Sequence, residues 1–590
     1  MPSAVTTPRT LCEAFQSVAA LEPDAIALRD LGGDVAITWR QYQDRVRSIA
    51  AGLAGLGIGR GDTVALMLTN RPEFHLCDTA TLHLGGTPFS VYNTNPAQVL
   101  AYQFDNADNR VVICERQFLP VIREAVQQGG NVEHIVCVDG ADGDALSLEQ
   151  LEAAPAPEFD FEAAWRAVEP DDLLTLVYTS GTTGPPKGVE LTHANFLENA
   201  RILDDFGVRN QPNRMISYLP DAHAANRWFS HYAQLLHGGQ ITTVADPKGV
   251  LDALTQVRPT YFLGVPRVWV KIKSGLQAAL ADQSPIRRKL AEWAIGAGRA
   301  RARAQSEARE LHPLARLQYP AADRLVLAKV RQKLGLDEVV AAVSGAAPIP
   351  REVHEFILGL GIPLSEGWGM SECTAAVTVN PLHRIKIGTV GLPVPGARIT
   401  LADDGEVLVR GPMVMRGYRK DPAKTAEAID TDGWLHTGDI GELDPDGYLK
   451  IIDRKKELII NAAGKNMSPT NIENAVLANC PLVSSVVVIG EQRQYNTMLI
   501  CLDPDAATAF AAQHGLPDDL ATVAGHPELV AAVQTGIDAA NATLSRVEQI
   551  KKFTVLPEVW LPGSAYLTPT GKLKRASIVA HYAQTIEAMY

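Results

Sequence analysis

The loop "YTSGTTGPPKGVE" (178–190) constrains this chain most, because it leads from the apolar run "LLTLV" into the strand-like run "GVEL". Glycines let backbone N–H groups converge on an anion, and Lys187 adds a positive charge, so the pattern is typical of a phosphate-binding loop. A P-loop NTPase would begin a helix at the lysine and place Ser or Thr directly after it. Here Pro186 precedes Lys187 and Gly188 follows it. The sequence therefore predicts a phosphate site between two strands.

The segments on both sides of this loop predict an α/β fold. Before it, the β-rich runs "TVALML", "PFSVY", "RVVIC" and "HIVCV" are separated by helical stretches such as 41–56 and 72–84. After it, similar units follow through "GQITTV", "PTYFLGV" and "EVVAAVSG". Strands that alternate with helices form mostly parallel sheets with helices on their faces. We therefore expect mostly parallel sheets flanked by helices in the N-terminal part of the chain.

Two later segments depart from this alternation of strands and helices. Residues 285–334 combine helix formers with many Arg and Lys and predict an inserted helical hairpin. Its basic stretch "GRARARAQSEARE" is either a solvated helical face or a surface for anionic lipid. From Gly388 onward, short strands punctuated by Gly and Pro predict a small distorted β-barrel or a small sheet.

A domain boundary is expected at Asp453, within "IIDRKKELII". The chain of 590 residues is too long for one hydrophobic core. Beyond the boundary, Ser468 is placed to cap a helix whose first residue is Pro469, and strands and helices follow. We expect a large domain over residues 1–452 and a small, mobile α+β domain over residues 453–590.

Composition excludes several classes of protein. A net charge of −13 argues against a nucleic-acid partner. The seven scattered cysteines include no C-x-x-C pair, which fits reduced thiols in a cytoplasmic protein better than a disulfide framework or a zinc site. No run approaches 18 apolar residues, and the N-terminus has no apolar signal region. Peripheral contact with the inner membrane surface stays open, as does the oligomeric state.

Further motifs follow the loop, in this order: "SYLPDAHAANRW", "SEGWGMSE", "GWLHTGD", "DRKKELII", "NAAGKNMSP" and "LTPTGKLKR". Together with the loop they resemble the adenylate-forming (AMP-binding) superfamily, which comprises acyl-CoA synthetases, adenylation domains of peptide synthetases and firefly-type luciferases. The resemblance runs from about Trp39 to Arg575. The helical insertion and the run "RQKLGLDEVVAAVSGAAPIP" resemble the long-chain fatty acyl-CoA synthetase (fatty-acid–CoA ligase) branch in particular.

The resemblance implies an ATP site. The loop would grip the β- and γ-phosphates, and Thr179 and Glu372 would lie at Mg²⁺. Trp368 would face the adenine, while Asp439 and Arg454 would bind the ribose hydroxyls. The residues expected to bind ATP or AMP are Thr179, Ser180, Gly181, Thr182, Thr183, Gly184, Lys187, Gly345, Ala346, Glu366, Gly367, Trp368, Gly369, Ser371, Asp439 and Arg454.

The resemblance also implies a two-step reaction with Lys572, His223 and Glu372 as catalytic residues. A carboxylate attacks the α-phosphorus of ATP, giving acyl-AMP and pyrophosphate, with Lys572 reaching the carboxylate and the α-phosphate. The C-terminal domain then turns about the hinge Asp453, and the thiol of coenzyme A displaces AMP. That thiol would benefit from a base, for which His223 is the candidate. The residues expected to line the channel for coenzyme A are Gly464, Lys465 and Asn466.

The acyl chain is expected to contact Trp228, Tyr232, Gly264 and Val265. Small residues leave room for a tunnel, but tight sheet packing uses them equally. The motif around His223 departs from the family pattern, which usually has an apolar residue where Asp221 stands and often a Glu where Asn226 stands. The polarity of the pocket, and with it the type of acid, is thereby left open.

The expected substrates are a fatty acid, ATP and coenzyme A, and two alternatives share the motifs. A fatty acyl-AMP ligase would deliver the acyl group to a carrier protein instead of coenzyme A. A catalytically silent regulator would bind a nucleotide or lipid without turnover. The presence of Lys572, Glu372 and Asp439 together argues against the silent regulator.

Overall fold

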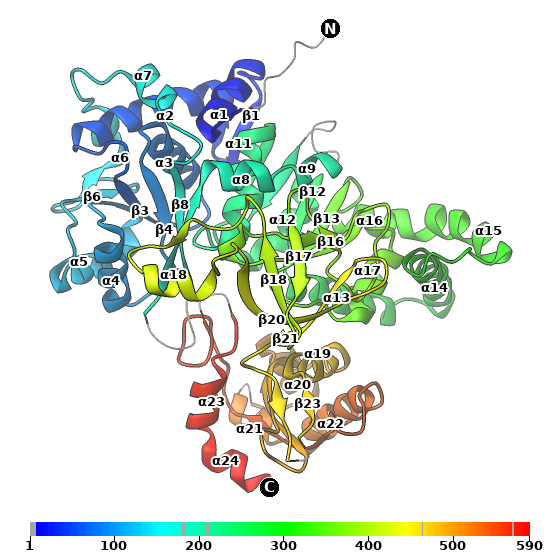
Figure 1. The fold of residues 1–590 in the computed structure, drawn as a ribbon. Coiled ribbons are helices and arrows are strands. Elements are labelled where there is room, and N and C mark those ends of the chain that lie inside the picture. Colours follow the sequence, from blue (N-terminus) through cyan, green and yellow to red (C-terminus); the bar gives the residue numbers. More distant parts are fainter. Residues whose placement is uncertain (1–7, 180–184, 207–212, 463, 518, 569–570) are drawn as a thin grey trace.

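A five-stranded parallel sheet follows the N-terminal helix α1 (Leu11–Leu21) and the helix α2 (Trp39–Gly55). Its strands lie in the order β4 (Thr87–Ser90), β3 (Thr63–Met67), β5 (Val111–Cys114), β6 (His134–Cys137) and β7 (Leu146–Ser147). Between these strands run α3 (Pro72–His83), α4 (Ala97–Ala107) and α5 (Leu119–Gln128) (Figure 1). This computed structural model describes residues 8–179, 185–206, 213–462, 464–517, 519–568 and 571–590.

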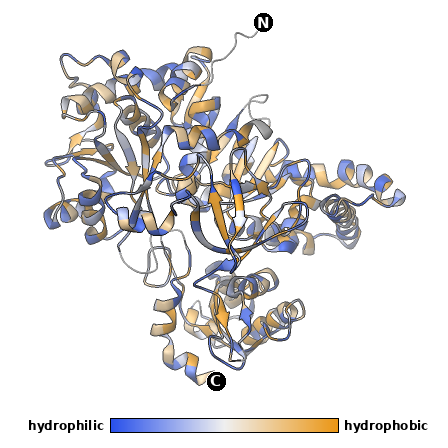
Figure 2. Cartoon of the chain, in the orientation of Figure 1, coloured by the Kyte–Doolittle hydropathy of each residue, from blue (hydrophilic) through white to orange (hydrophobic). Residues whose placement is uncertain are grey.

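Two further sheets complete the parallel part of the fold. One has the order β10 (Arg214–Ser217), β11 (Gln240–Thr243), β1 (Ile26–Asp30) and β2 (Ala36–Thr38), with only β2 antiparallel. The other has the order β12 (Tyr261–Gly264), β13 (Ala341–Ser344), β14 (Leu364–Trp368), β15 (Thr378–Val379) and β16 (Leu392–Pro393), of which the first three are parallel. Figure 2 shows hydrophobic strands in the interior of these layers. The predicted α/β architecture is confirmed.

The phosphate loop joins two antiparallel strands, as its sequence predicts. Strand β8 (Leu173–Thr179) precedes it and β9 (Lys187–Thr192) follows it, and β19 (Gly417–Tyr418) pairs with the far edge of β9. Thr192 then caps α8 (His193–Asn199), accepting a hydrogen bond from the N–H of Asn195. A strand, not a helix, therefore follows Lys187.

The Gly- and Pro-rich segment forms an open antiparallel sheet. Its strands lie in the order β17 (Arg398–Leu401), β18 (Glu406–Arg410), β20 (Leu435–Leu443) and β21 (Leu449–Arg454). Register shifts interrupt both the β18–β20 and the β20–β21 pairings. The described strands of this segment therefore form a small irregular sheet, one of the two forms that the sequence predicts.

The C-terminal region has a hydrophobic core of its own. Its sheet has the order β24 (Val483–Ile489), β25 (Asn496–Leu502) and β26 (Ile550–Leu556). The helices α19 (Pro469–Asn479), α20 (Pro504–His514) and α22 (Pro527–Asn541) accompany it, and Ser468 caps α19 as predicted. Asp453 is the penultimate residue of β21. The domain limits 1–452 and 453–590 stay a prediction.

The basic segment is helical throughout, as predicted, apart from the turn at 307–312. It consists of α14 (Pro285–Ser306), α15 (Pro313–Ala322), the π-helical turn η5 (Asp323–Leu327) and α16 (Ala328–Leu334). It projects from the body of the molecule beside α13 (Pro266–Ala281) and α17 (Arg351–Gly359) (Figure 1). In the described part of the chain, no helix combines the length and apolar character needed to cross a membrane.

The remaining elements connect these units. They are α6 (Leu148–Glu152), α7 (Phe161–Arg166), α9 (Ile202–Asp205), α10 (Ala224–Asn226), α11 (Ala233–His237), α12 (Val250–Val257), α18 (Pro422–Ala428), β22 (Ile459–Ile460), β23 (Asn466–Met467), α21 (Leu520–Ala524), α23 (Arg575–His581) and α24 (Ala583–Ala588). All seven cysteines are free thiols and buried, as the sequence predicts.

Candidate active site

The two ends of the phosphate loop are held by the β8–β9 ladder. Thr179 and Lys187 are register partners, and the Thr179 hydroxyl lies 3.5 Å from the Lys187 carbonyl oxygen, to which it donates. The predicted loop residues Ser180, Gly181, Thr182, Thr183 and Gly184 lie outside the described residues.

Tyr418 links the loop lysine to the expected metal carboxylate. Lys187 Nζ donates to the Tyr418 hydroxyl at 2.9 Å and lies 4.0 Å from the centre of its ring. The same hydroxyl donates to Glu372 Oε1 at 2.8 Å. Burial lowers the pKa of Lys187, and the nearby Glu372 carboxylate opposes that shift. Lys187, Tyr418 and Glu372 therefore form one connected polar chain.

Sequence reasoning missed Tyr418. It stands 231 residues after Lys187 and reaches the site because β19 pairs with β9. The surrounding run "MRGYRKDP" carries no local sign of this pairing, since a two-residue strand is too short for a periodic pattern.

The donors at Glu372 fit a magnesium ion that is completed by substrate. Glu372 is buried, with 5% of its surface exposed, and Thr179 contributes a hydroxyl at the loop end. Across the described residues, no three His, Cys, Asp or Glu side chains cluster as a self-sufficient metal site. Mg²⁺ usually takes only one or two protein carboxylates and fills its shell with phosphate oxygens and water. The residues present therefore suit an ion that arrives with a nucleotide.

Asp439 is held in place by two of the residues predicted to bind the nucleotide. Trp368 Nε1 donates to Asp439 Oδ2 at 2.8 Å, and Arg454 Nε lies 2.7 Å from Asp439 Oδ1. Asp439 and Arg454 also face each other across the β20–β21 ladder. Burial raises the pKa of Asp439, and the Arg454 charge counteracts it. The structure thus brings together Trp368, Asp439 and Arg454 through their own contacts.

The segment around Trp368 is shaped by close backbone contacts. A Cβ on Gly369 would lie 2.1 Å from the Ala375 carbonyl oxygen, and one on Gly367 would lie 3.2 Å from that of Thr378. Gly369 is therefore required by packing. Ser371 follows at the start of the 3₁₀ turn η6 (Ser371–Cys373) that carries Glu372.

Glu366 supports the neighbouring loop. Its Oε1 accepts a hydrogen bond of 3.2 Å from the N–H of Ile349, and burial raises its pKa to about 8. That loop follows β13 and carries Gly345 and Ala346, the latter in the left-handed region with a φ of 68°. By accepting from Ile349, Glu366 holds the loop that also carries the predicted nucleotide residues Gly345 and Ala346.

Lys572 comes from the C-terminal region and lies at this site. Its neighbours include Arg454, Asp439 and Glu372, whose charges act on its amine. Crowding by protein atoms lowers the pKa of Lys572, Arg454 lowers it further, and the two carboxylates oppose both effects. Its backbone N–H donates to the Thr568 hydroxyl at 3.0 Å.

His223 lies within electrostatic reach of Lys572. Burial lowers its pKa to about 4, and the Lys572 charge adds to the shift, so the ring is neutral at pH 7. The N–H of Ala225 donates to His223 Nδ1 at 3.2 Å, at the start of α10. Because Nδ1 accepts, the ring proton sits on Nε2. His223 therefore offers a donor at Nε2, which disfavours the expected role as a base for the thiol.

Comparison with known proteins agrees with this arrangement. A family model described as AMP-binding enzyme matches residues 15–419, and one described as AMP-binding enzyme C-terminal domain matches residues 456–590. The protein of Mycobacterium tuberculosis provisionally named fatty-acid–CoA ligase fadD11 is 50% identical over 448 residues, which are 75% of this chain and 78% of that protein. The long-chain-fatty-acid–CoA ligase FadD15 of the same species is 34% identical over 567 residues, 94% of this chain and 92% of its own.

The chain belongs to the AMP-binding enzyme family. The predicted superfamily and its fatty acyl-CoA ligase branch are confirmed. Among solved structures, the adenylation domain of a carboxylate reductase from Mycobacterium chelonae matches with a TM-score of 0.74 at 22% identity, over 98% of this chain and 91% of that one. The anthranilate CoA ligase AuaEII in complex with anthranoyl-AMP matches with a TM-score of 0.72 at 19% identity, over 98% of both chains. These two likenesses establish the fold.

Asp453, the residue predicted to be the hinge of this AMP-binding enzyme, is tied to the C-terminal region. Asp453 Oδ2 accepts hydrogen bonds from the Ser468 hydroxyl at 2.5 Å and from the Thr470 N–H at 3.1 Å. A carboxylate at the N-terminus of α19 also interacts favourably with the helix dipole. Strand β21 is thereby fastened to the first long helix beyond it.

The predicted residues of the coenzyme A channel lie on a surface turn of the C-terminal region. Gly464 has a φ of 73°, and a Cβ there would meet no atom within 4 Å. The Lys465 N–H donates to Asn461 Oδ1 at 2.9 Å, and Asn466 begins β23. The channel stays a prediction.

Two of the four predicted acyl-pocket residues line a small cavity. Trp228 and Tyr232 line a cavity of about 10 Å³ with Phe196, which has room for about one water molecule. At Gly264, a Cβ would approach the Trp269 ring to 2.8 Å. Val265 precedes α13 as its N-cap residue. For Gly264 the geometry favours the alternative of tight packing, and the path of the acyl chain stays open.

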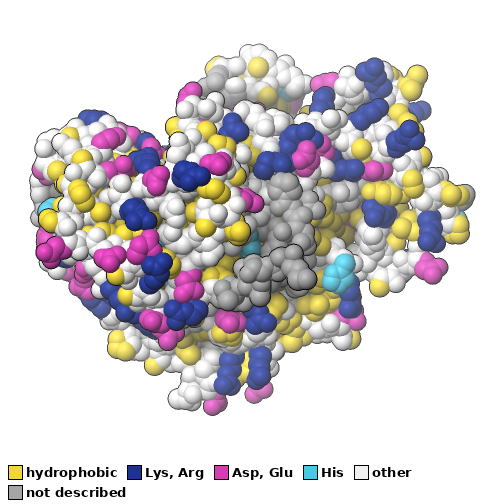
Figure 3. Space-filling view, turned by 90° about the horizontal axis from the view of Figure 1, so that it is seen from above, with side chains coloured by type: hydrophobic (Ala, Val, Ile, Leu, Met, Phe, Trp, Pro, Cys, Tyr) yellow, Lys and Arg dark blue, Asp and Glu magenta, His cyan; other side chains and the backbone are white. Residues whose placement is uncertain are grey.

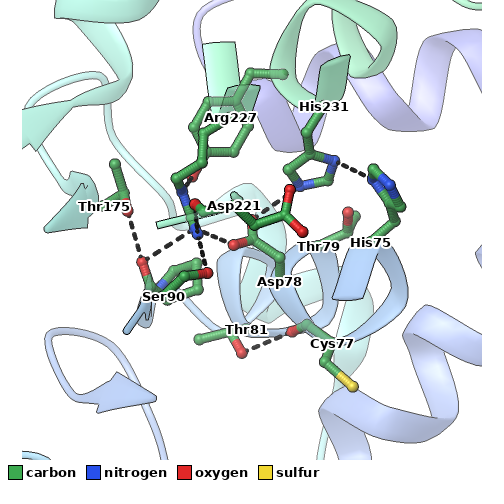
Figure 4. Close-up of polar contacts among 12 residues, drawn as sticks. His75, Cys77, Asp78, Thr79, Thr81, Ser90, Thr175, Asp221, Arg227 and His231 are labelled. Carbon is green, nitrogen blue, oxygen red and sulfur yellow. Dashed lines mark hydrogen bonds and ion pairs between the residues drawn. The ribbon is translucent and has the colours of Figure 1, made fainter. Parts of the chain in front are cut away.

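The two departures from the family motif hydrogen-bond to each other. Asn226 Nδ2 donates to Asp221 Oδ1 at 2.6 Å and to the Ser217 hydroxyl at 3.1 Å. Burial raises the pKa of Asp221 to about 8. Its carboxyl group lies beside a buried network in which Asp78 accepts from Arg227 and pairs with His231 (Figure 4). Asp221 and Asn226 thus belong to a polar core.

Proposed function

We propose that this chain is an AMP-forming fatty-acid–CoA ligase, which activates a fatty acid with ATP and transfers the acyl group to coenzyme A. The observation that carries the proposal is the meeting of Lys572 with Asp439 and Glu372 at one site, although they come from different regions of the chain. The names of relatives that align along most of the chain support a long-chain acid as the substrate.

In the first step, the chain positions ATP and a carboxylate. Lys187 at the loop end and the Tyr418–Glu372 pair would hold the β- and γ-phosphates, and Asp439 and Arg454 would hold the ribose. Mg²⁺, held by Glu372 and Thr179, would neutralise charge on the phosphate oxygens. Positioning and electrostatic stabilisation are the main contributions a protein makes to such a displacement.

Lys572 and His223 would act on the reacting groups from two sides. The ammonium of Lys572 would offset negative charge on the carboxylate and the α-phosphate as they approach each other. The Nε2–H of His223 would donate to an oxygen of the same groups. Acyl-AMP and pyrophosphate result, and no enzyme-bound covalent intermediate is required.

In the second step, the C-terminal domain would turn about Asp453. This motion withdraws Lys572 and brings the turn with Gly464, Lys465 and Asn466 toward the site. The thiol of coenzyme A then attacks the acyl carbon, and AMP leaves with the electron pair of the cleaved bond.

The test is coupled AMP release by the purified chain with fatty acids of graded length, sterol-side-chain acids and aromatic acids. We expect AMP release that needs both ATP and coenzyme A and that is fastest with long-chain acids. Acyl-AMP that accumulates without thioester formation would favour the carrier-protein alternative. Nucleotide binding without ATP–pyrophosphate exchange, across the whole panel, would contradict the proposal.

We also propose that the helical hairpin over residues 285–334 contacts anionic membrane surfaces. This segment carries twelve Lys or Arg and only four Asp or Glu, whereas the whole chain has a net charge of −13. Ile286 and Leu317 are 82% and 76% exposed. Figure 3 shows Lys and Arg side chains among hydrophobic ones over this projecting part, on the right of the view. Basic helices with exposed apolar side chains bind anionic lipid surfaces.

Vesicle co-sedimentation tests this surface. We expect binding to vesicles with anionic lipid, weakened by salt and lost in the variant Ile286→Ser/Leu317→Ser. The variant Leu561→Ser is a matched control, because Leu561 is 64% exposed in the C-terminal region. Equal binding to neutral vesicles, or equal loss in the control, would contradict the proposal.

A further inference from the structure

Arg267 is the second residue of α13 and lies where the N-terminal part meets the C-terminal region. It directly follows the end of β12, the strand that carries Gly264. Its guanidinium reaches β24, the edge strand of the C-terminal sheet. The two partners are 217 residues apart in the sequence.

The hydrogen-bond partner of Arg267, Ser484, lies at a β-bulge in β24. Val483 pairs with Leu502 and Ser485 pairs with Cys501, so the register shifts at Ser484 and leaves this residue without a cross-strand partner. The Ser484 hydroxyl turns back and donates to the Leu502 carbonyl oxygen at 2.8 Å. A bulged residue on an edge strand presents its own carbonyl outside the ladder.

Arg267 satisfies that carbonyl. Its Nη2 donates to the Ser484 carbonyl oxygen at 2.5 Å and lies 3.2 Å from the Ser485 hydroxyl, to which it also donates. Hydrogen bonds from a charged donor are stronger than those between neutral groups. Asp503, also in the C-terminal region, is the carboxylate whose charge acts on Arg267. The hydrogen bonds of this arginine therefore join it to the C-terminal region.

The contact exists in the same domain arrangement that puts Lys572 beside Asp439 and Glu372. The two regions also come close at Gly563 of the C-terminal region, where a Cβ would lie 2.7 Å from Thr94 of the N-terminal part. A rotation about Asp453 would carry β24 away from α13 and break both hydrogen bonds of Arg267.

We propose that Arg267 is a positioning residue, which latches the C-terminal domain in the orientation that presents Lys572 for acyl-AMP formation. The proposal rests on the proposed two-step function. The hydrogen bonds of Arg267 go to Ser484 and Ser485, and among the described residues none joins it to Lys572, Glu372 or His223. Its hydrogen bonds favour the Lys572-in orientation over the orientation for thioester formation, and they must break between the two half-reactions.

The first test measures the two half-reactions of Arg267→Gln. We expect kcat of ATP–pyrophosphate exchange to fall about tenfold, as loss of charge-assisted hydrogen bonds predicts, with KM for ATP unchanged. Thioester formation from supplied acyl-AMP should stay at the wild-type rate or rise. Lys271→Gln is the matched control, because Lys271 is an exposed cation one turn further along the same helix.

The partner side gives a second test. Ser485→Ala removes one of the two acceptors and should lower exchange less than Arg267→Gln does. The double variant should be no slower than Arg267→Gln alone, since the two side chains act through one contact. Fully additive losses, or equal losses in both half-reactions, would overturn the latch.

A third measurement does not depend on activity. Because the seven native cysteines are buried, dyes can be attached to Asp282→Cys and Gln513→Cys, which lie in the two regions. In this labelled protein, energy transfer with ATP bound should report a larger fraction of open molecules for Arg267→Gln than for wild type. An unchanged distribution would overturn the latch. If the open fraction differs between wild type and Arg267→Gln as expected but the wild type activates no acid, the latch stands and the proposed function is contradicted.

Discussion

The N-terminal and C-terminal contributions to the site are held in different ways. On the N-terminal side, Lys187, Tyr418 and Glu372 hydrogen-bond to one another, and Asp439 is fixed by Trp368 and Arg454. Lys572, by contrast, hydrogen-bonds through its backbone to Thr568 of the C-terminal region, so its place depends on how that region docks. We infer that the predicted nucleotide side is preorganised by its own contacts, whereas Lys572 is delivered by the orientation of the C-terminal region.

Removing the amine of Lys572 should have the largest effect on ATP–pyrophosphate exchange. Lys572→Ala should slow ATP–pyrophosphate exchange about a thousandfold, because the main cation facing the developing charge is lost. ATP binding, followed by calorimetry, should change little, since the N-terminal contacts remain. Lys551→Ala, an exposed lysine of the same region, is the control. A large loss of ATP affinity would show that the two sides are not separable in this way.

Removing the carboxylate of the preorganised side comes next. Glu372→Gln should slow exchange about a hundredfold, as loss of one electrostatic contact to the phosphates predicts. Unlike Lys572→Ala, it should also raise the Mg²⁺ concentration needed for half-maximal exchange. Glu427→Gln, at an exposed position, should change neither quantity. An unchanged Mg²⁺ requirement would contradict the assignment of Glu372.

A smaller effect on exchange should follow from removing the Tyr418 hydroxyl, which links Lys187 to Glu372. Tyr418→Phe keeps the ring beneath Lys187 but removes the hydroxyl that joins it to Glu372, and exchange should fall about tenfold. Tyr448→Phe removes a hydroxyl that donates to the Arg384 carbonyl oxygen and should leave exchange unchanged. If both variants behave alike, the Tyr418 hydroxyl has no special role.

The smallest effect is a shift in pH dependence. Only protonated Lys572 can offset negative charge, so exchange should fall as the pH rises through its pKa. Because crowding and Arg454 lower that pKa, the fall should begin at a lower pH than for an ordinary lysine. Lys572→Arg should move the fall to higher pH, since an arginine stays charged. An unchanged profile in Lys572→Arg would indicate that another group titrates.

Local signals in the sequence predicted the local structure well. The cap Ser468 and the strand after Lys187 follow from residue types within a few positions. The order of motifs identified the family and so the meeting of Lys572 with Asp439. These features depend on chain neighbours or on a resemblance that covers most of the chain.

Contacts between distant residues could not be predicted in this way. The Tyr418 hydroxyl and the Arg267 guanidinium reach their partners through sheet pairing and domain docking, which leave no periodic pattern. Short Gly-punctuated strands do not say whether a sheet closes, so the sequence left a barrel and a small sheet open, and the described strands form the sheet. The acyl pocket stays a prediction, since small residues such as Gly264 serve tight packing as well as cavities.

The most direct test asks whether Lys572 is needed only in the first half-reaction. It supplies the variant Lys572→Ala with the acyl-AMP that this variant forms only slowly. Lys572→Ala, supplied with a fatty acyl-AMP and coenzyme A, should form the thioester at close to the wild-type rate, because Lys572 has left the site in that step. A loss as large as that in ATP–pyrophosphate exchange would contradict the account.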